Sequence, residues 1–298
     1  MPEGDVVRRS ALRLHAALAG RVLTRSQLRW PSPATVDLTG REVLEVISVG
    51  KHLLARLTGR QGQPTPLTLR SHLRMEGSWS VRASDGPAAK AAARDHDVRA
   101  VLGNDDWTAI GHRLGMLDLV ATEQEHRLVG HLGPDVLSTS WDRSEVIRRL
   151  RCRDCEEIGE LLLDQRVLAG VGTFYMSEAL FLRGRSPWTT AHDLSDAELI
   201  RLLDLVHALM TANLDRGLQI TTGDARPGRR SWVHARSGRP CRRCGTGVRV
   251  AMIGEPARQR TAFYCPACQP GPAPTDDSRA QRPLGYAPPG RRRTRSPR

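Results

Sequence analysis

Residues 241–268 read CRRCGTGVRVAMIGEPARQRTAFYCPAC, and this stretch decides the fold of the C-terminal part of the chain. It opens on one Cys-x-x-Cys turn and closes on another, with β-type runs on either side of Gly254. Four thiolates in two such turns suit a closed tetrahedral zinc site. We therefore predict a β-hairpin zinc finger with one structural Zn²⁺ ion. Its ligands would be Cys241, Cys244, Cys265 and Cys268; unligated cysteines are the alternative.

The same hairpin carries Arg258 and Arg260 near its tip. Because all four metal positions are filled by protein, the metal would hold the fold and would not activate water. The two arginines are then the candidate functional groups of the finger, able to contact DNA phosphate or a base.

The charge of the whole chain also favours a polyanionic partner. The 298 residues include 45 Lys and Arg against 32 Asp and Glu, a formal net charge of +13. Mean hydropathy is −0.41, and no apolar run approaches the ~18 residues that a membrane helix needs. With no secretory signal pattern, we expect a cytoplasmic, nucleoid-associated protein without a membrane partner. In a reducing compartment its six cysteines favour metal ligation over disulfides.

Apolar periodicity divides the chain into parts. We predict an α+β multidomain fold: an N-terminal antiparallel β-sandwich domain at 1–125 with a flanking helix, a helical domain at 126–222, the zinc finger at 223–269, and a disordered basic tail at 270–298. The expected strands are 42–49, 52–58, 67–73, 78–82, 98–102 and 114–120. The expected helices are 5–18, 144–151, 156–168, 173–183 and 195–216, the last with a capping box formed by Ser195 and Glu198.

Only two lysines, Lys51 and Lys90, stand among the 45 basic residues, so each is a candidate for a specific role. Lys90 lies in an alanine-rich segment that we interpret as a loop. Lys51 lies between two β-type runs, where a solvated strand charge is the alternative interpretation.

Two further motifs are weaker. Ala169-Gly170-Val171-Gly172-Thr173 joins two helical runs, and its glycines would let backbone N–H groups at the next helix start approach a phosphate. A plain helical hairpin is the alternative. Cys152 and Cys155 form a third pair without a partner pair, and we interpret them as reduced, incidental thiols.

The N-terminus reads Met1-Pro2-Glu3. Removal of Met1 would expose the secondary amine of Pro2, which can condense with a deoxyribose C1′ aldehyde to give a cationic iminium. Glu3 beside it could protonate a leaving or ring oxygen. Taken alone, an ordinary chain start is the alternative.

In this order, the motifs resemble those of the formamidopyrimidine-DNA glycosylase/endonuclease VIII family of base-excision repair enzymes, over about residues 1–269. Met-Pro-Glu-Gly at 1–4 is similar to the endonuclease VIII branch. The other matching motifs are the strand lysine at 49–54, a helix–two-turn–helix at 163–180 and the zinc finger at 238–269.

The resemblance implies roles for particular residues. Pro2 would be the Schiff-base nucleophile, Glu3 the proton donor, and Lys51 and Arg260 the contacts with phosphate at the lesion. The turn with Gly170, Gly172 and Thr173 would bind DNA. Met75, with Arg74 beside it, would fill the gap left by an everted base; core packing is the alternative for Met75.

The chain departs from the family pattern at two positions. After Gly4 the chain continues with Asp5-Val6, so it lacks the second carboxylate that the family pattern has at position 6. At the helix turn, Thr173 stands where the family usually has asparagine. The resemblance implies a monomeric bifunctional DNA glycosylase/AP lyase acting on damaged duplex or single-stranded DNA. It would excise oxidised bases, pyrimidines favoured, by β,δ-elimination. An oxidised-purine (formamidopyrimidine/8-oxoguanine) glycosylase, a catalytically silent damaged-DNA-binding protein and a zinc-ribbon regulator are alternatives.

Overall fold

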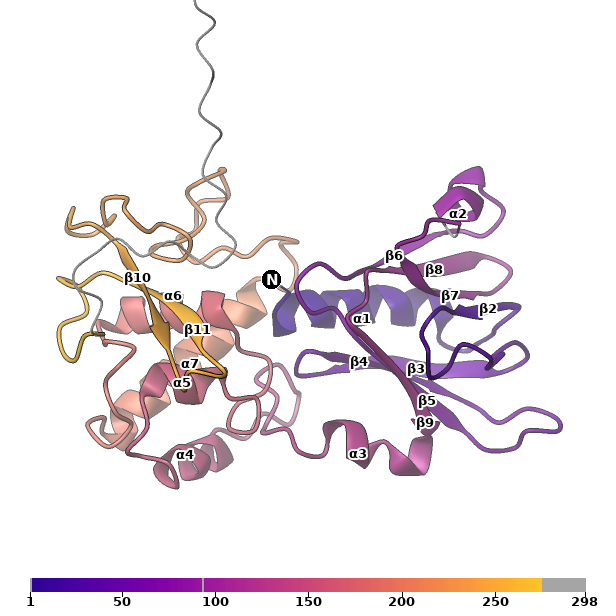
Figure 1. Ribbon diagram of the computed structural model, residues 1–298, viewed down its shortest axis with the longest axis horizontal. Helices are drawn as coiled ribbons and strands as arrows, with labels where there is room; N and C mark the ends of the chain where they lie inside the picture. Colours follow the sequence, from indigo (N-terminus) through magenta and orange to yellow (C-terminus); the bar gives the residue numbers. More distant parts are fainter. Residues whose placement is uncertain (1, 93, 275–298) are drawn as a thin grey trace, which may run out of the picture.

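The computed structural model describes residues 2–92 and 94–274, which form two lobes side by side (Figure 1). The sandwich lobe holds two antiparallel sheets with strand orders β1-β3-β4-β5-β9 and β2-β7-β8-β6. Its strands are β1 (Arg21–Val22), β2 (Arg25–Leu28), β3 (Glu42–Val49), β4 (His52–Leu57), β5 (Leu67–His72), β6 (Ser78–Ala83), β7 (Val98–Gly103), β8 (Trp107–His112) and β9 (Met116–Ala121). The predicted β-sandwich is confirmed.

Helix α1 (Gly4–Leu18) flanks this sandwich and places the N-terminus between the lobes (Figure 1). Val7, Ala11, Leu14 and Leu18 recur at helical spacing and are buried in the sandwich core. Because that stripe fixes the helix against the sheets, the first residues are directed towards the helical lobe. The sequence therefore determines where the chain start lies.

After β9 come η1 (Thr122–Gln124) and α3 (His126–Val129), which lie beside the sandwich (Figure 1), where Glu125 accepts hydrogen bonds from Arg56 of β4 and Thr68 of β5. The helical lobe contains α4 (Arg143–Arg151), α5 (Ile158–Leu163), α6 (Thr173–Arg183), α7 (Asp196–Ala212), β10 (Arg249–Ile253) and β11 (Arg260–Tyr264). The predicted capping box of Ser195 and Glu198 starts α7. Ile253 and Tyr264 of the β10–β11 hairpin pack into the core of the helices, so the hairpin and the helices form one body.

Several predicted elements differ from the structure. The segment around Lys90 is a short helix, α2 (Pro87–Ala92), and not a loop, because proline suits the first helical turn and alanine favours the turn that follows. The helix expected over 156–168 begins at Ile158 and ends at Leu163, where Asp164 takes an extended conformation. Strand β8 was not predicted, since Gly111 interrupts its apolar pattern.

The boundary of the tail also needs correction. Residues 270–274 are ordered against the helical lobe, where Ser186 Oγ donates to the carbonyl of Pro272 at 2.5 Å. The rest of the predicted tail, 275–298, lies outside the described residues, as does Met1. Within the described part of the chain, no helix is both long enough and apolar enough to cross a membrane.

Candidate active site

The carboxylate of Glu3 caps helix α6 from the other lobe. It accepts hydrogen bonds from the backbone N–H groups of Gly172 and Phe174, both at 2.7 Å, and from that of Tyr175 at 3.5 Å. The first N–H groups of a helix have no partner within the helix and carry partial positive charge, so they favour an acidic group. Glu3 is only 1% exposed, and Pro2 beside it is half-buried.

Burial raises the pKa of Glu3 above its usual value, against the opposing effects of Lys51 and of the Phe174 and Gly172 amides. A carboxyl with a raised pKa keeps its proton to higher pH and can act as a general acid. This environment supports the role that the sequence suggests for Glu3.

Glycines allow the N-terminus and the turn before α6 to approach closely. A Cβ on Gly172 would lie 2.5 Å from Cδ of Glu3. A Cβ on Gly4 would lie 3.0 Å from Cα of Gly170, whose carbonyl accepts a hydrogen bond from Gly4 N at 2.9 Å. Any side chain at Gly4 or Gly172 would therefore have to push the two segments apart.

Lys51 occupies the turn between β3 and β4, at the same junction. The turn is held by Asp135, whose Oδ2 accepts from Gly50 N at 2.8 Å. Burial lowers the pKa of Lys51, Glu3 opposes that shift, and Arg260 adds to it. Glu3 and Arg260 thus both act electrostatically on Lys51, although the three residues come from distant parts of the sequence.

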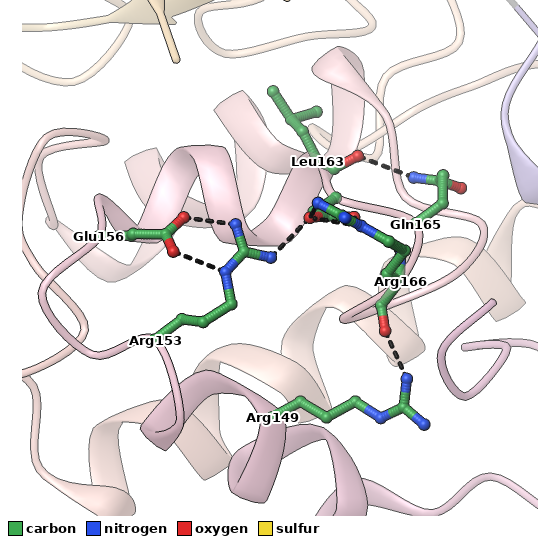
Figure 2. A network of polar contacts seen from close by, with 7 residues as sticks. Arg149, Arg153, Glu156, Leu163, Gln165 and Arg166 are labelled. Atoms are coloured by element: carbon green, nitrogen blue, oxygen red, sulfur yellow. Dashed lines mark hydrogen bonds and ion pairs between the residues drawn. The ribbon is translucent and has the colours of Figure 1, made fainter. Parts of the chain in front are cut away.

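A network of polar contacts around Arg153 and Gln165 supports the segment that leads into the turn before α6 (Figure 2). Gln165 Nε2 donates to the carbonyls of Leu163 and Val171 at 3.0 and 2.9 Å, and its Oε1 accepts from Gly170 N at 3.0 Å. Arg153, which also contacts Glu156, donates to Asp164 at 2.6 Å beside this turn. The side-chain amide of Gln165 therefore joins the two ends of the loop between α5 and α6. The same loop ends at Gly172, which donates to Glu3.

These contacts bear on one prediction. The N–H groups of Gly170 and Gly172 donate to Gln165 and Glu3. Thr173, the first residue of α6, is buried at 4% exposure. The glycine-rich turn therefore holds the N-terminus of the chain, and contact of Gly170, Gly172 and Thr173 with DNA stays a prediction.

Glu178 is a buried acid to which the sequence assigned no role. Its carboxylate accepts from the backbone N–H groups of Trp232, Val233 and His234 at 2.7–2.8 Å and from the hydroxyl of Thr221. This carboxylate ties the segment before the zinc finger to α6. In the sequence, the signal for such a role is a charged residue within a helical run that is otherwise mostly apolar.

Two exposed segments carry predicted DNA contacts, the loop between β5 and β6 at residues 74–76 and the hairpin turn at Arg258, and we call them together the exposed rim. Met75 is 64% exposed, which excludes core packing for it, and Arg74 beside it has a φ of +49°. Arg113, which the sequence did not single out, also has a positive φ of +45° and bonds Asp97 at 2.7 Å. Strained backbone of this kind is concentrated at functional sites.

The four predicted ligands come together in the finger. The Sγ atoms of Cys241, Cys244, Cys265 and Cys268 all lie within 4.8 Å of one another. The Cys241–Cys268 and Cys244–Cys265 separations are 3.9 and 3.5 Å. Sulfurs on a tetrahedral ion with bonds of about 2.3 Å lie about 3.8 Å apart, so the cluster fits one metal ion. Arg258 is exposed in the turn and Arg260 begins β11.

Comparison with known proteins gives a consistent result. Residues 1–113 match the family model of the formamidopyrimidine-DNA glycosylase N-terminal domain, and residues 132–224 match that of its H2TH domain. The "Probable endonuclease 8 2" of Streptomyces coelicolor is 49% identical over 94% of this chain and 98% of its own length. The "DNA-(apurinic or apyrimidinic site) lyase Nei2" of Mycolicibacterium smegmatis is 39% identical over 90% and 99%.

A solved structure shares the fold. The formamidopyrimidine-DNA glycosylase of Lactococcus lactis, noncovalently bound to DNA containing an AP site, superposes with a TM-score of 0.72 at 22% identity. The match covers 90% of this chain and 100% of that one.

Proposed function

Because the chain belongs to the formamidopyrimidine-DNA glycosylase/endonuclease VIII family, we propose that it is a bifunctional DNA glycosylase and AP lyase acting on oxidised bases in DNA. The observation that carries the proposal is the junction between the lobes. There Pro2 precedes a buried carboxyl on the N-terminus of α6, with Lys51 and Arg260 within electrostatic reach.

The chemistry follows from these groups. After loss of Met1, the Pro2 nitrogen attacks C1′, the C1′–N glycosidic bond breaks, and the base leaves with the proton that the Pro2 nitrogen gives up. The C1′–O4′ bond then breaks as Glu3 supplies a proton to the ring oxygen O4′, and the nitrogen lone pair forms the iminium with C1′. The resulting iminium acidifies the C2′ proton. Elimination then releases the 3′ phosphate and subsequently the 5′ phosphate, which leaves a one-nucleotide gap. Lys51 and Arg260 bind the flanking phosphates.

The remaining parts support this reaction. Zn²⁺ is the metal that four clustered thiolates suit, and it would hold the finger that presents Arg258 and Arg260. Met75 and Arg74 would occupy the space of an everted base. The Streptomyces coelicolor relative is named an endonuclease 8, and the chain start resembles that branch, so we propose oxidised pyrimidines as the favoured substrates; the formamidopyrimidine-DNA glycosylase fold match keeps oxidised purines as the second candidate.

Borohydride trapping on duplex DNA with one abasic site tests the proposal. We expect a covalent adduct with the wild type, joined through the Pro2 nitrogen when its peptides are analysed by mass spectrometry, and a much slower one with Pro2→Ala. The primary amine of alanine gives an imine that is cationic only when protonated, whereas the secondary amine of proline gives a permanently cationic iminium. Mass spectrometry of the active enzyme should find Met1 removed. Absence of an adduct with correctly processed wild-type protein would support a silent damaged-DNA-binding protein instead.

A panel of defined lesions in duplex and single-stranded DNA then decides the substrate. Faster excision of oxidised pyrimidines than of 8-oxoguanine or formamidopyrimidine supports the proposed preference. The reverse order would assign the chain to the purine-specific candidate while leaving the lyase reaction intact.

A further inference from the structure

Asp5 is a buried acid that the proposed reaction does not use. It lies in the first turn of α1, is 0% exposed, and accepts a hydrogen bond on Oδ1 from Gln219 Nε2 at 3.1 Å. Its Oδ2 has no hydrogen-bond partner among residues 2–92 and 94–274. Because its hydrogen bond directs Asp5 at Gln219, we do not assign Asp5 the catalytic role of the missing carboxylate at position 6.

The segment that faces Asp5 is itself closed by buried polar contacts. Asn213, at 0% exposure, donates through Nδ2 to the hydroxyl of Tyr175 at 2.8 Å and to the carbonyl of Ile220 at 3.1 Å. The backbone carbonyl of Asn213 accepts a hydrogen bond from Arg9 at 2.7 Å. Arg9 lies one helical turn along α1 from Asp5. Gln219 is thus presented from a fixed loop.

The anchors of the N-terminus come from two directions. Glu3 and Gly4 are held by the turn before α6, whereas Asp5 is held by the segment that follows α7. The apolar stripe that packs α1 on the sandwich begins at Val7, so it does not hold residues 3–5. The two anchors from different segments fix that part of the chain.

We propose that Asp5 is a positioning residue that, through its hydrogen bond with Gln219, fixes the first turn of α1 and with it Pro2 and Glu3. The inference rests on the proposed lyase function. Displacement of a reacting group by about 1 Å can cost about a hundredfold in rate, so a short buried anchor three residues from the nucleophile has a direct effect on reactivity.

The charges around Asp5 make its hydrogen bond with Gln219 sensitive to the protonation of the carboxyl group. Three groups interact electrostatically with Asp5: Glu3 on the same segment, Arg9 on α1, and the hydroxyl of Tyr175 on α6. Burial raises the pKa of Asp5, and Arg9 opposes that shift. A second carboxylate at position 219 would therefore repel Asp5 once both groups have lost their protons.

Single-turnover borohydride trapping at saturating abasic duplex tests the proposal, at a temperature where circular dichroism shows every variant folded. The variants are Asp5→Ala, Gln219→Glu, and the double swap Asp5→Asn with Gln219→Glu. Asp215→Asn is the matched control, since Asp215 is exposed in the same segment. Affinity for the same duplex is measured in parallel.

We expect Asp5→Ala to trap about tenfold more slowly with little change in affinity. Gln219→Glu should trap at a rate that falls as pH rises, because its two carboxyls can share a proton only at low pH. The double swap should restore the rate and remove that pH dependence, since an amide at position 5 donates to a carboxylate at 219. The control should match the wild type.

Trapping by Asp5→Ala at the wild-type rate would overturn the proposal, as would a double swap no faster than Gln219→Glu alone. Failure of the wild type to trap at all would instead overturn the proposed lyase function.

Discussion

The junction between the lobes and the exposed rim are built in opposite ways. At the junction, Glu3, Asp5 and Gly172 are buried, Glu3 accepts a hydrogen bond from Gly172, and Asp5 accepts one from Gln219, so contacts within the protein set their positions. At the rim, Met75 and Arg258 are exposed. Groups that perform chemistry must be preorganised, whereas groups that grip a polyanion can be ordered by it.

The largest effect should come from removing the proton of Glu3. Glu3→Gln keeps the shape of the side chain but loses the acid, so single-turnover base excision should fall by about 10²–10⁴-fold. Because burial raises the pKa of Glu3, its acid form persists to higher pH and is lost as pH rises through that pKa. Wild-type excision should therefore decline on the alkaline side, and the variant should lack that decline. A variant that keeps the alkaline decline would assign it to another group.

A smaller effect should follow from disturbing the geometry alone. In Gly172→Ala the added Cβ would lie 2.5 Å from Cδ of Glu3 and would force the carboxyl away from α6. We expect excision to slow by about ten- to a hundredfold while the variant stays folded. Gly247→Ala is the control, because a Cβ there has no neighbour within 4 Å. Equal rates for the two variants would mean that the junction tolerates displacement.

The smallest effect belongs to the rim. Arg258→Ala should weaken binding of damaged and undamaged duplex alike and reduce the slope of log K against log salt by about 0.9 per lost phosphate contact. The rate of trapping at saturating DNA should stay unchanged, because Arg258 is exposed in the hairpin turn. A change confined to damaged duplex would instead indicate that Arg258 contacts the lesion.

Local patterns in the sequence predicted much of the architecture. Strand β3 and helix α6 have the predicted bounds, the capping box at Ser195 is present, and the four cysteines predicted to bind one metal ion converge. The segment at Lys90 was misassigned because an alanine-rich run after proline carries too little polarity contrast to show a helical face. The proposed roles of Pro2 and Glu3 came from the chemistry of the chain start and from the family resemblance, not from any local periodicity.

Spacing and composition were enough to identify the candidate metal ligands, the capping box of Ser195, the amphipathic helix that carries the chain start, and the positive charge. Long-range packing alone brings Glu3 to a helix 169 residues away, Asp5 to Gln219 across 214 residues, and Asp135 to the turn of Lys51. A buried carboxylate must find its donors wherever packing places them, and no short-range pattern encodes those partners.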